Sequence, residues 1–410
     1  MISHPATDSI PAPRGPTLPA PSPEPPRHLP ATLAEAAAVL RETAARREPL
    51  AFQGGGTDLG LGAPGAPCAV LETTRLARVV EYAPSDQVVV AEAGLRLADL
   101  QRLLAREGQR LALDPPLPER ATLGGILSAG AFGPLRTRYG APRDLVLGIA
   151  VVRADGAVVR GGGKVVKNVA GFDLPRLFSG ALGTLGLVAE LCFRVHPLPE
   201  TSATVLLRGL DAAGAWRVTR SLRDAQLEPA AVAALREAGP FELGIRFEGF
   251  EAGVSAQARR ALELAGSGAA TLLEPAPAAA FWERHDTLRR AGALRLKLTS
   301  LPASLGQVDD GPLTALRRAL ADGVTVWYPA LGLGFAGGEP LDGAAAAVAR
   351  ARAELAKLGG ALTVCAAPPF LRAGLDPWGP PPPALTVMRR LKDRLDPDRR
   401  LAPGRFVGGL

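Results

Sequence analysis

Glycine clusters in the first half of the chain constrain its fold more than any other feature. The longest such segment is GGGKVVKNVAGFDLPRLFSGALGTLGLV, residues 161–188, which leads into an apolar, β-rich run from Leu185 to Val195. Two others are QGGGTD, residues 53–58, and ATLGG, residues 121–125. Glycine at this density beside a strand indicates backbone that approaches something bulky or adopts positive φ. Because converging N–H groups at such turns can bind anionic oxygen, we expect a cofactor with phosphates.

A single glycine turn of this kind is better explained as a tight connection between two elements. Three of them, each after a strand or a rigid bend such as the DPP at residues 114–116, favour a common binding role. Thr57, Thr122 and Ser128 lie in or beside these turns and can add hydroxyl donors to phosphate. The first half of the chain is therefore predicted to bind the cofactor.

Other nucleotide-binding and catalytic motifs are not supported. Residues 60–65 match G-x-G-x-x-G by letter, but Pro64 and the lack of a following helix argue against a Rossmann turn. The GGGK at residues 161–164 is followed by Val165, whereas a Walker A loop needs Ser or Thr there. No G-x-S-x-G is present for a serine hydrolase. The histidines show no metal-binding spacing, and no metal site is expected; they are His4, His28, His196 and His285.

Composition and length narrow the class of protein. At 410 residues the chain exceeds one compact core, which predicts two or three domains. The three cysteines are scattered, which favours a reduced, cytoplasmic setting over a disulfide framework or an iron–sulfur cluster. The net charge of +7 comes mostly from scattered arginine without interleaved aromatics, so nucleic acid is not an expected partner. No apolar run reaches the roughly 18 residues of a transmembrane helix.

The order of elements predicts the first folded unit. The Pro-rich residues 1–30 should form a disordered tail without a signal peptide. Thr32 should cap a helix from Leu33 to about Arg46, with Glu35 at the third helical position. A hairpin is expected around Asp155-Gly156, and the unit should close near the PLP at residues 197–199. The further expected elements are strands at 49–53, 68–71, 87–91, 145–153, 157–160 and 185–195, and a helix at 95–106.

The second half of the chain alternates between strands and helices. We expect strands at 203–207, 242–247, 293–299 and 324–328, helices at 252–264 and 344–358, and a last helix at 384–395. This pattern fits an antiparallel sheet with helices on one face. In residues 294–299 the leucines share one face of the strand, and Arg295 and Lys297 share the other. Those two cations could hold a substrate carboxylate, although a solvated outer face is the simpler and preferred explanation from the sequence alone.

Several of these segments, in order and spacing, resemble a known family. They are QGGGTD, LALDPP, ATLGG, RYGAPRDLVLG, GGGKVVKNVAGFDL and GALGTLG, followed near the C-terminus by RLKDRLDPDRRLAPGRF. Together they resemble the vanillyl-alcohol-oxidase, or PCMH-type, FAD-binding family, and within it the E subunits of bacterial glycolate oxidases. The resemblance implies an α+β fold: a PCMH-type FAD-binding domain of two α/β subdomains at 31–200, a smaller α/β cap domain at 201–383, and a C-terminal helix and tail at 384–410.

The resemblance also implies where FAD binds. The turns at residues 53–58 and 122–125 would hold its pyrophosphate, and the absence of histidine from the first turn implies a non-covalent flavin. Four positions depart from the family pattern, with Gly130 for Asn, Phe172 for Tyr, Ala181 for Ser and Ala402 for Asn, and the changes at Gly130, Ala181 and Ala402 each remove a polar contact. The full expected set of FAD-binding residues is Gln53, Gly54, Gly55, Gly56, Thr57, Asp58, Pro115, Ala121, Thr122, Gly124, Gly125, Ser128, Gly183 and Leu187.

The function implied by the resemblance is that of an FAD-binding subunit in a glycolate oxidase complex, which oxidises glycolate or related 2-hydroxy acids to 2-oxo acids. Its partners would be a catalytic flavoprotein subunit and an iron–sulfur subunit, with any membrane association through them. The catalytic subunits carry a histidine-rich metal site in the cap, which His285 alone cannot form, and no general base is evident. Two alternatives remain: a stand-alone FAD-dependent dehydrogenase of another hydroxy acid, and a non-catalytic scaffold with weakened FAD binding.

Overall fold

The computed structural model describes residues 25–65, 68–164, 172–266 and 270–410. Most of the expected tail lies outside these ranges. The expectation of disorder is wrong for residues 27–28. They form a short strand, β1 (Arg27–His28), which pairs in parallel with residues 70–71 of strand β3 (Ala69–Glu72). Within the described residues, no helix is long and apolar enough to cross a bilayer.

The first subdomain is a small parallel sheet with one helix. The strands run in the order β1-β3-β2, where β2 is Leu50–Gln53 and β3 is Ala69–Glu72. Helix α1 (Leu33–Ala45) begins as predicted, since Thr32 Oγ1 accepts a hydrogen bond from the N–H of Glu35 at 3.1 Å. The apolar side of α1 packs with both sheets of the first half through Ala36, Leu40, Leu50, Leu71, Val152 and Leu187.

The second subdomain is an antiparallel sheet of five strands, in the order β4-β5-β9-β7-β8. Its core packs against α2 and α3, and the β7–β8 hairpin turns at Gly156, which has a φ of +78°. The elements are β4 (Val79–Ala83), β5 (Val88–Glu92), α2 (Leu97–Ala105), β6 (Gln109–Arg110), α3 (Leu123–Ala129), α4 (Arg136–Tyr139), α5 (Pro142–Leu145), β7 (Val146–Val152), β8 (Val158–Gly162), α6 (Leu174–Phe178), β9 (Leu187–Arg194) and β10 (His196–Pro197). The short 3-10 turn η1 (Pro84–Asp86) joins β4 to β5.

The second half of the chain forms an antiparallel sheet of eight strands, in the order β14-β11-β13-β12-β16-β17-β15-β18. Its strands are β11 (Thr201–Leu210), β12 (Ala231–Arg236), β13 (Phe241–Gly249), β14 (Ala270–Leu273), β15 (Leu294–Thr299), β16 (Leu320–Tyr328), β17 (Leu333–Pro340) and β18 (Ala361–Ala366). Its helices are α7 (Ala212–Asp224), α8 (Glu251–Ala265), α9 (Pro275–Leu288), α10 (Leu305–Val308), α11 (Thr314–Arg318) and α12 (Ala344–Lys357), with the turns η2 (Pro302–Ser304) and η3 (Asp309–Leu313).

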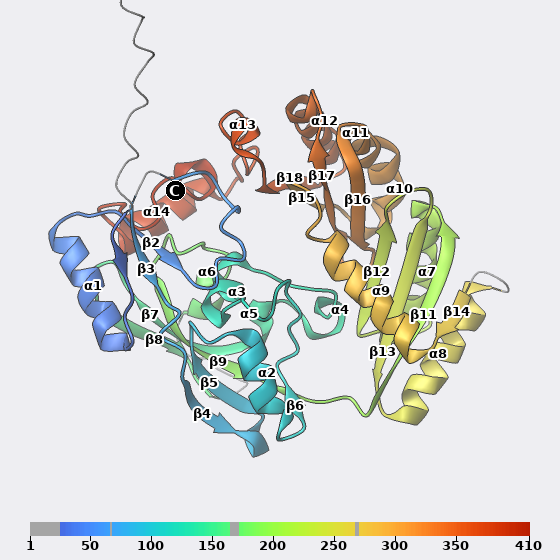
Figure 1. The fold of residues 1–410 in the computed structure, drawn as a ribbon, viewed down its shortest axis with the longest axis horizontal. Helices are drawn as coiled ribbons and strands as arrows, with labels where there is room; N and C mark the ends of the chain where they lie inside the picture. The colour runs from blue at the N-terminus through green and yellow to red at the C-terminus, as the bar shows by residue number, and fades with distance from the viewer. Residues whose placement is uncertain (1–24, 66–67, 165–171, 267–269) are drawn as a thin grey trace, which may run out of the picture.

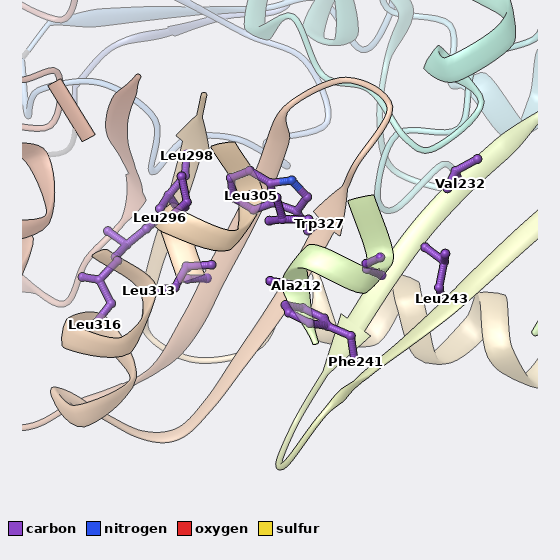
Figure 2. Close-up of a cluster of buried hydrophobic side chains, with 14 of the residues drawn as sticks. Ala212, Val232, Phe241, Leu243, Leu296, Leu298, Leu305, Leu313, Leu316 and Trp327 are labelled. Carbon is purple, nitrogen blue, oxygen red and sulfur yellow. The ribbon is translucent and has the colours of Figure 1, made fainter. Parts of the chain in front are cut away.

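Helices cover both faces of this sheet, which corrects the expectation of one covered face. Figure 2 shows the larger core, where Leu296 and Leu298 of β15 and Trp327 of β16 lie with side chains of the outer helices. On the opposite face, α9 packs through Phe281 and Leu288 against neighbouring strand residues and Phe132 of the first half. In Figure 1, α9 lies on the side of the cap that faces the first domain. The sheet therefore presents one strand face toward the FAD-binding half.

The C-terminal segment returns to the first domain (Figure 1). After α13 (Pro369–Arg372), helix α14 (Leu385–Leu395) buries Lys392, whose Nζ donates to the carbonyl of Thr184 at 2.7 Å and pairs with Asp396 at 2.7 Å. The tail then pairs with β2, because the N–H of Leu50 donates to the carbonyl of Arg400. The last turn is η4 (Val407–Gly409). Residues 384–410 thus pack on the cofactor-binding half, and Trp378 also donates from Nε1 to the carbonyl of Arg405 at 3.1 Å.

Candidate functional site

The first glycine turn leaves β2 and lines a cleft. Within the described part of the chain, the backbone N–H groups from Gly54 to Asp58 have no protein acceptor. A row of free N–H groups suits the oxygens of a phosphate. The turn itself is packed tightly on the second glycine segment: a Cβ on Gly55 would lie 1.7 Å from the carbonyl oxygen of Arg120. A Cβ on Gly54 would lie 2.0 Å from Thr122 Oγ1.

The second glycine segment begins α3. Thr122 caps the helix and accepts a hydrogen bond from the N–H of Gly125 at 3.3 Å. Gly124 donates to the carbonyl of Ala93 at 2.7 Å and has no space for a side chain, since its Cβ would lie 2.7 Å from that of Ala93. The glycines at 54, 55 and 124 are therefore required mainly because a side chain at these positions would clash with neighbouring segments of the protein. Gly125 and Ser128 lie along the same cleft.

The third segment contributes only its C-terminal part. Gly183, with a φ of +78°, and Gly186 line the cleft, and Leu182 donates to the carbonyl of Ser128 at 2.9 Å. The GGG at residues 161–163 does not line it. Gly161 and Gly162 end β8 at an edge of the five-stranded sheet, so these glycines belong to the strand end and not to the cleft.

Most of the expected FAD-binding residues meet in this one cleft, which we call the glycine cleft. Pro115 and Ala121 do not line it, because Pro115 is buried and Ala121 is packed in the core of the second subdomain. The expected residues that do line it are Gln53, Gly54, Gly55, Gly56, Thr57, Asp58, Thr122, Gly124, Gly125, Ser128, Gly183 and Leu187. Lining residues that the sequence analysis missed are Phe52, Leu59, Thr73, Ala129, Leu182, Gly186, Val188 and Arg405.

Arg405 is the missed residue that a sequence signal could have revealed. It lies in the PGRF of the C-terminal tail, a segment singled out above only for its family resemblance. Its guanidinium donates from Nε to the carbonyl of Leu61 at 3.2 Å, and Arg372 donates to the carbonyls of Gly60 and Gly62 at 3.1 Å. These two arginines fix the loop that follows the first glycine turn.

A second cavity, of about 310 Å³, lies between the two domains and shares Thr57, Asp58 and Ala129 with the glycine cleft. We call it the interdomain cavity. Arg295 and Lys297 of β15 line it, so they do not form a solvated outer face. The other main contributors are Arg289 and Arg290 after α9, Phe335 of β17, Cys365 of β18, Phe132 of the first domain, and Trp378 and Phe406 near the C-terminus.

The interdomain cavity is strongly basic. Within the described residues, none of Arg289, Arg290, Arg295 and Lys297 forms an ion pair with a carboxylate. The Nη1 of Arg289 is buried without a hydrogen-bond partner, and its guanidinium stacks 4.4 Å from the ring centre of Phe335. Burial lowers the pKa of Lys297, since a charged ammonium loses solvation there. The unpaired cations of the interdomain cavity are therefore suited to binding an anion.

Polar side chains behind the cavity form hydrogen bonds with neighbouring protein groups. His285 is 1% exposed, and its Nε2 lies 2.8 Å from the hydroxyl of Tyr328, its Nδ1 2.9 Å from Asp286 Oδ1. Asp114 accepts a hydrogen bond from the N–H of Leu135 at 2.9 Å, and burial raises its pKa to about 7. Among the described residues, no group of three or more His, Cys, Asp or Glu side chains is placed to hold a metal ion.

Comparison with known proteins identifies the cofactor-binding half. Residues 28–162 match the family described as "FAD binding domain". The chain is 33% identical over 276 residues to the glycolate oxidase subunit GlcE of Escherichia coli (strain K12), a match that covers 66% of this chain and 72% of that protein. The chain belongs to the family of this subunit. It is an FAD-linked oxidoreductase of the PCMH type, as the sequence resemblance predicted, and FAD is its cofactor.

Other relatives share a smaller part of the chain. The glycolate oxidase subunit GlcD of Bacillus subtilis (strain 168) is 34% identical over 44% of this chain and 39% of its own length. The D-lactate dehydrogenase of Archaeoglobus fulgidus is 32% identical over 41% of this chain and 38% of its own. Among solved structures, p-cresol methylhydroxylase has the same fold, with a TM-score of 0.73, 15% identity, and coverage of 92% of this chain and 88% of that one.

The residues of the glycine cleft fit FAD. The free N–H groups of the first glycine turn can bind the pyrophosphate, and the continuity with the interdomain cavity leaves a path for the flavin ring toward Arg295 and Lys297. Two departures from the family pattern lie away from the cleft: Ala402 is 3% exposed, with a φ of +43°, and Ala181 is 7% exposed. Phe172 is 90% exposed, and Gly130 lines the interdomain cavity. Loss of side-chain polarity at Ala181 and Ala402 therefore does not remove a group from the cleft itself.

We expect the flavin to be bound without a covalent link. No histidine lines the glycine cleft or the interdomain cavity in the described ranges. The thiol of Cys365 lines the cavity, but burial raises its pKa to about 11, and a protonated thiol is a poor nucleophile. Precipitation of the yellow protein with trichloroacetic acid should leave all flavin absorbance in the supernatant. Flavin retained in the washed pellet would contradict this expectation.

Proposed function

We propose that this chain is the FAD-bearing subunit of a complex that oxidises a 2-hydroxy acid, such as glycolate, to the 2-oxo acid. The observation that carries the proposal is the junction of two sites: the glycine cleft opens into a cavity lined by cations without carboxylate partners. A carboxylate with a neighbouring hydroxyl is the type of ligand that suits such a cavity beside a flavin. Membership in the family of a glycolate oxidase subunit supports the same substrate class.

The chain's own residues have separable tasks in this proposal. FAD, when bound, supplies the acceptor for two electrons. The first glycine turn positions the pyrophosphate, and Arg295 and Lys297, two positions apart on β15, hold the carboxylate. Phe132 and Phe335 line the cavity with apolar rings, which limits access of water. No histidine lines the cavity among the described residues to accept the hydroxyl proton, so we assign completion of the reaction to the complex.

Electron transfer away from the flavin also requires partners. The cysteines Cys68, Cys192 and Cys365 are free thiols, and Cys192 is buried in the five-stranded sheet. They cannot hold an iron–sulfur cluster, which needs about four ligands brought together. The proposed partners are a catalytic flavoprotein subunit and an iron–sulfur subunit.

A dye-reduction assay tests the dependence on partners. The isolated, FAD-loaded chain should show no steady turnover of glycolate or D-lactate, and turnover should appear when the catalytic flavoprotein and iron–sulfur subunits are added. Steady turnover by the isolated chain at about 1 per second, near the low end for enzymes, would contradict the proposal and favour a stand-alone dehydrogenase. A chain that takes up no FAD during titration would instead favour the scaffold alternative.

A further inference from the structure

Three cations from both domains converge on the ring of Phe132. The guanidinium carbon of Arg136 in α4 lies 4.5 Å from the ring centre, that of Arg289 lies 5.2 Å away, and Lys297 Nζ lies 5.4 Å away. The loop that carries Phe132 is held by Asp114, which accepts the N–H of Leu135 three residues later. The cluster is thus built on a fixed aromatic residue at the junction of the domains.

Unlike Arg110, Arg236 and Lys392, these three cations have no carboxylate partner among the described residues. Arg110 pairs with Glu248, and Arg236 pairs with Asp309. In contrast, the pKa of Lys297 is lowered first by burial and further by Arg136 and Arg289, so the cations repel one another. The cation–π contact with the face of Phe132 offsets only part of the repulsion between the three cations. A bound anion would offset the rest of this repulsion.

The charge of the whole cavity exceeds what a single carboxylate can neutralise. Arg290 and Arg295 line the same cavity as Arg289 and Lys297, and Asp58 is its one carboxylate among the described lining residues. Adjacent same-face positions on a strand, such as 295 and 297, are about 6.6 Å apart, whereas the two oxygens of one carboxylate are much closer together. One carboxylate held by Arg295 and Lys297 therefore leaves Arg136 and Arg289 without a counter-ion.

We propose that the interdomain cavity takes a 2-hydroxy acid that carries a second anionic group, a carboxylate or a phosphate. Arg295 and Lys297 bind the carboxylate beside the hydroxyl, and Arg289 binds the second group, while Arg136 adds positive charge at the same Phe132 ring. This assignment rests on the proposed function, since it specifies the substrate class of the same site. Guanidinium groups suit both carboxylate and phosphate, because each offers two oxygens to a planar pair of N–H donors.

Redox-inert anions of matched length test the inference on the full chain. Propionate, succinate and 3-phosphonopropionate are titrated at constant ionic strength, with and without FAD, and binding is followed by thermal unfolding and by the flavin absorption band. Succinate or 3-phosphonopropionate should bind at least about 10-fold more tightly than propionate, the factor expected for roughly 1.4 kcal/mol from one more ion pair. The comparison of these two ligands identifies the second group as carboxylate or phosphate.

A matched pair of variants locates the effect. Arg289→Met keeps an apolar side chain beside the rings of Phe132 and Phe335 but removes the charge. This variant should bind the doubly charged ligands only about 2-fold more tightly than propionate, with the affinity for propionate unchanged. Arg350→Met, on the exposed face of α12, should keep the full preference. Arg136→Met provides a second test if the first variant is unstable.

Equal affinity for propionate and succinate in the unaltered protein would overturn the second anionic subsite and leave the proposed oxidation of 2-hydroxy acids intact. Absence of binding by all three anions would overturn the subsite and the substrate-binding role of Arg295 and Lys297 together. Activity of the complex with glycolate, measured separately by dye reduction, distinguishes failure of the inference from failure of the proposed function.

Discussion

Gly55→Ala should destabilise the protein by about 3 kcal/mol and abolish FAD binding, because overpacking of this kind forces the backbone to move. The new Cβ would lie 1.7 Å from the carbonyl oxygen of Arg120 and 2.7 Å from its carbon, both of which are backbone atoms. The first glycine turn would separate from the start of α3, and the free N–H groups would lose their arrangement. Guanidinium unfolding of the FAD-free protein measures the first effect, and flavin titration measures the second.

Gly253→Ala is the matched control for this substitution. Gly253 lies in α8, and its added Cβ would meet no atom within 4 Å. This variant should be more stable by about 0.5–1 kcal/mol, the helix-propensity difference between the two residues, and should bind FAD fully. If Gly55→Ala lost flavin while the FAD-free protein kept its stability, the glycine would serve only the approach of the cofactor.

The local signals of the chain predicted individual elements well. Thr32 and Glu35 marked the start of α1, and Asp155-Gly156 marked the β7–β8 hairpin, since caps and tight turns depend on residues within a few positions. Alternation in residues 294–299 placed the leucines in the cap core, with Arg295 and Lys297 opposite. Strand β4 was missed because its edge position leaves Val80 52% exposed, without the alternation of a half-buried strand.

The arrangement of the site depended on contacts between distant segments. The sequence alone predicts that the glycines at 54, 55 and 124 approach the cofactor closely, whereas in the structure Arg120, Thr122 and Ala93 occupy the space beside them. That packing cannot be read from spacing along the chain. Likewise, the interdomain cavity combines β15, the end of α9, the first glycine turn and the C-terminal tail, so its charge was visible only as scattered arginine.

The position of helix α9 illustrates the same limit. Its sequence has no broad apolar face, but Phe281 and Leu288 pack on the side of the cap sheet opposite the other helices. This places Arg289 at the cavity, next to Phe132 of the first domain. The basic cluster therefore follows from the tertiary placement of α9, which its own pattern did not specify.

Lys392→Met should destabilise the protein by about 3–5 kcal/mol, the cost of leaving a buried charge without its partner. Lys392 is 2% exposed and Asp396 is 0% exposed, and the ammonium also donates to the carbonyls of Thr184 and Leu401 at 2.7 and 2.8 Å. The substitution removes three interactions and isolates the carboxylate of Asp396. Guanidinium unfolding of the variant and of the unaltered protein should measure this loss in the free energy of unfolding.

The Lys392→Met variant should also bind FAD at least about 10-fold more weakly, which corresponds to 1.4 kcal/mol. Thr184 follows Gly183 and Leu182, which line the glycine cleft, so α14 holds that wall of the cleft in place. The double variant Lys392→Met/Asp396→Asn should recover part of the stability, because an amide oxygen at position 396 can still accept the N–H of Leu401 without a buried charge. Lys357→Met, at the exposed end of α12, should change neither quantity. Equal losses in the single and double variants would show that packing of the lysine stem, and not its charge, fixes α14 to the cleft.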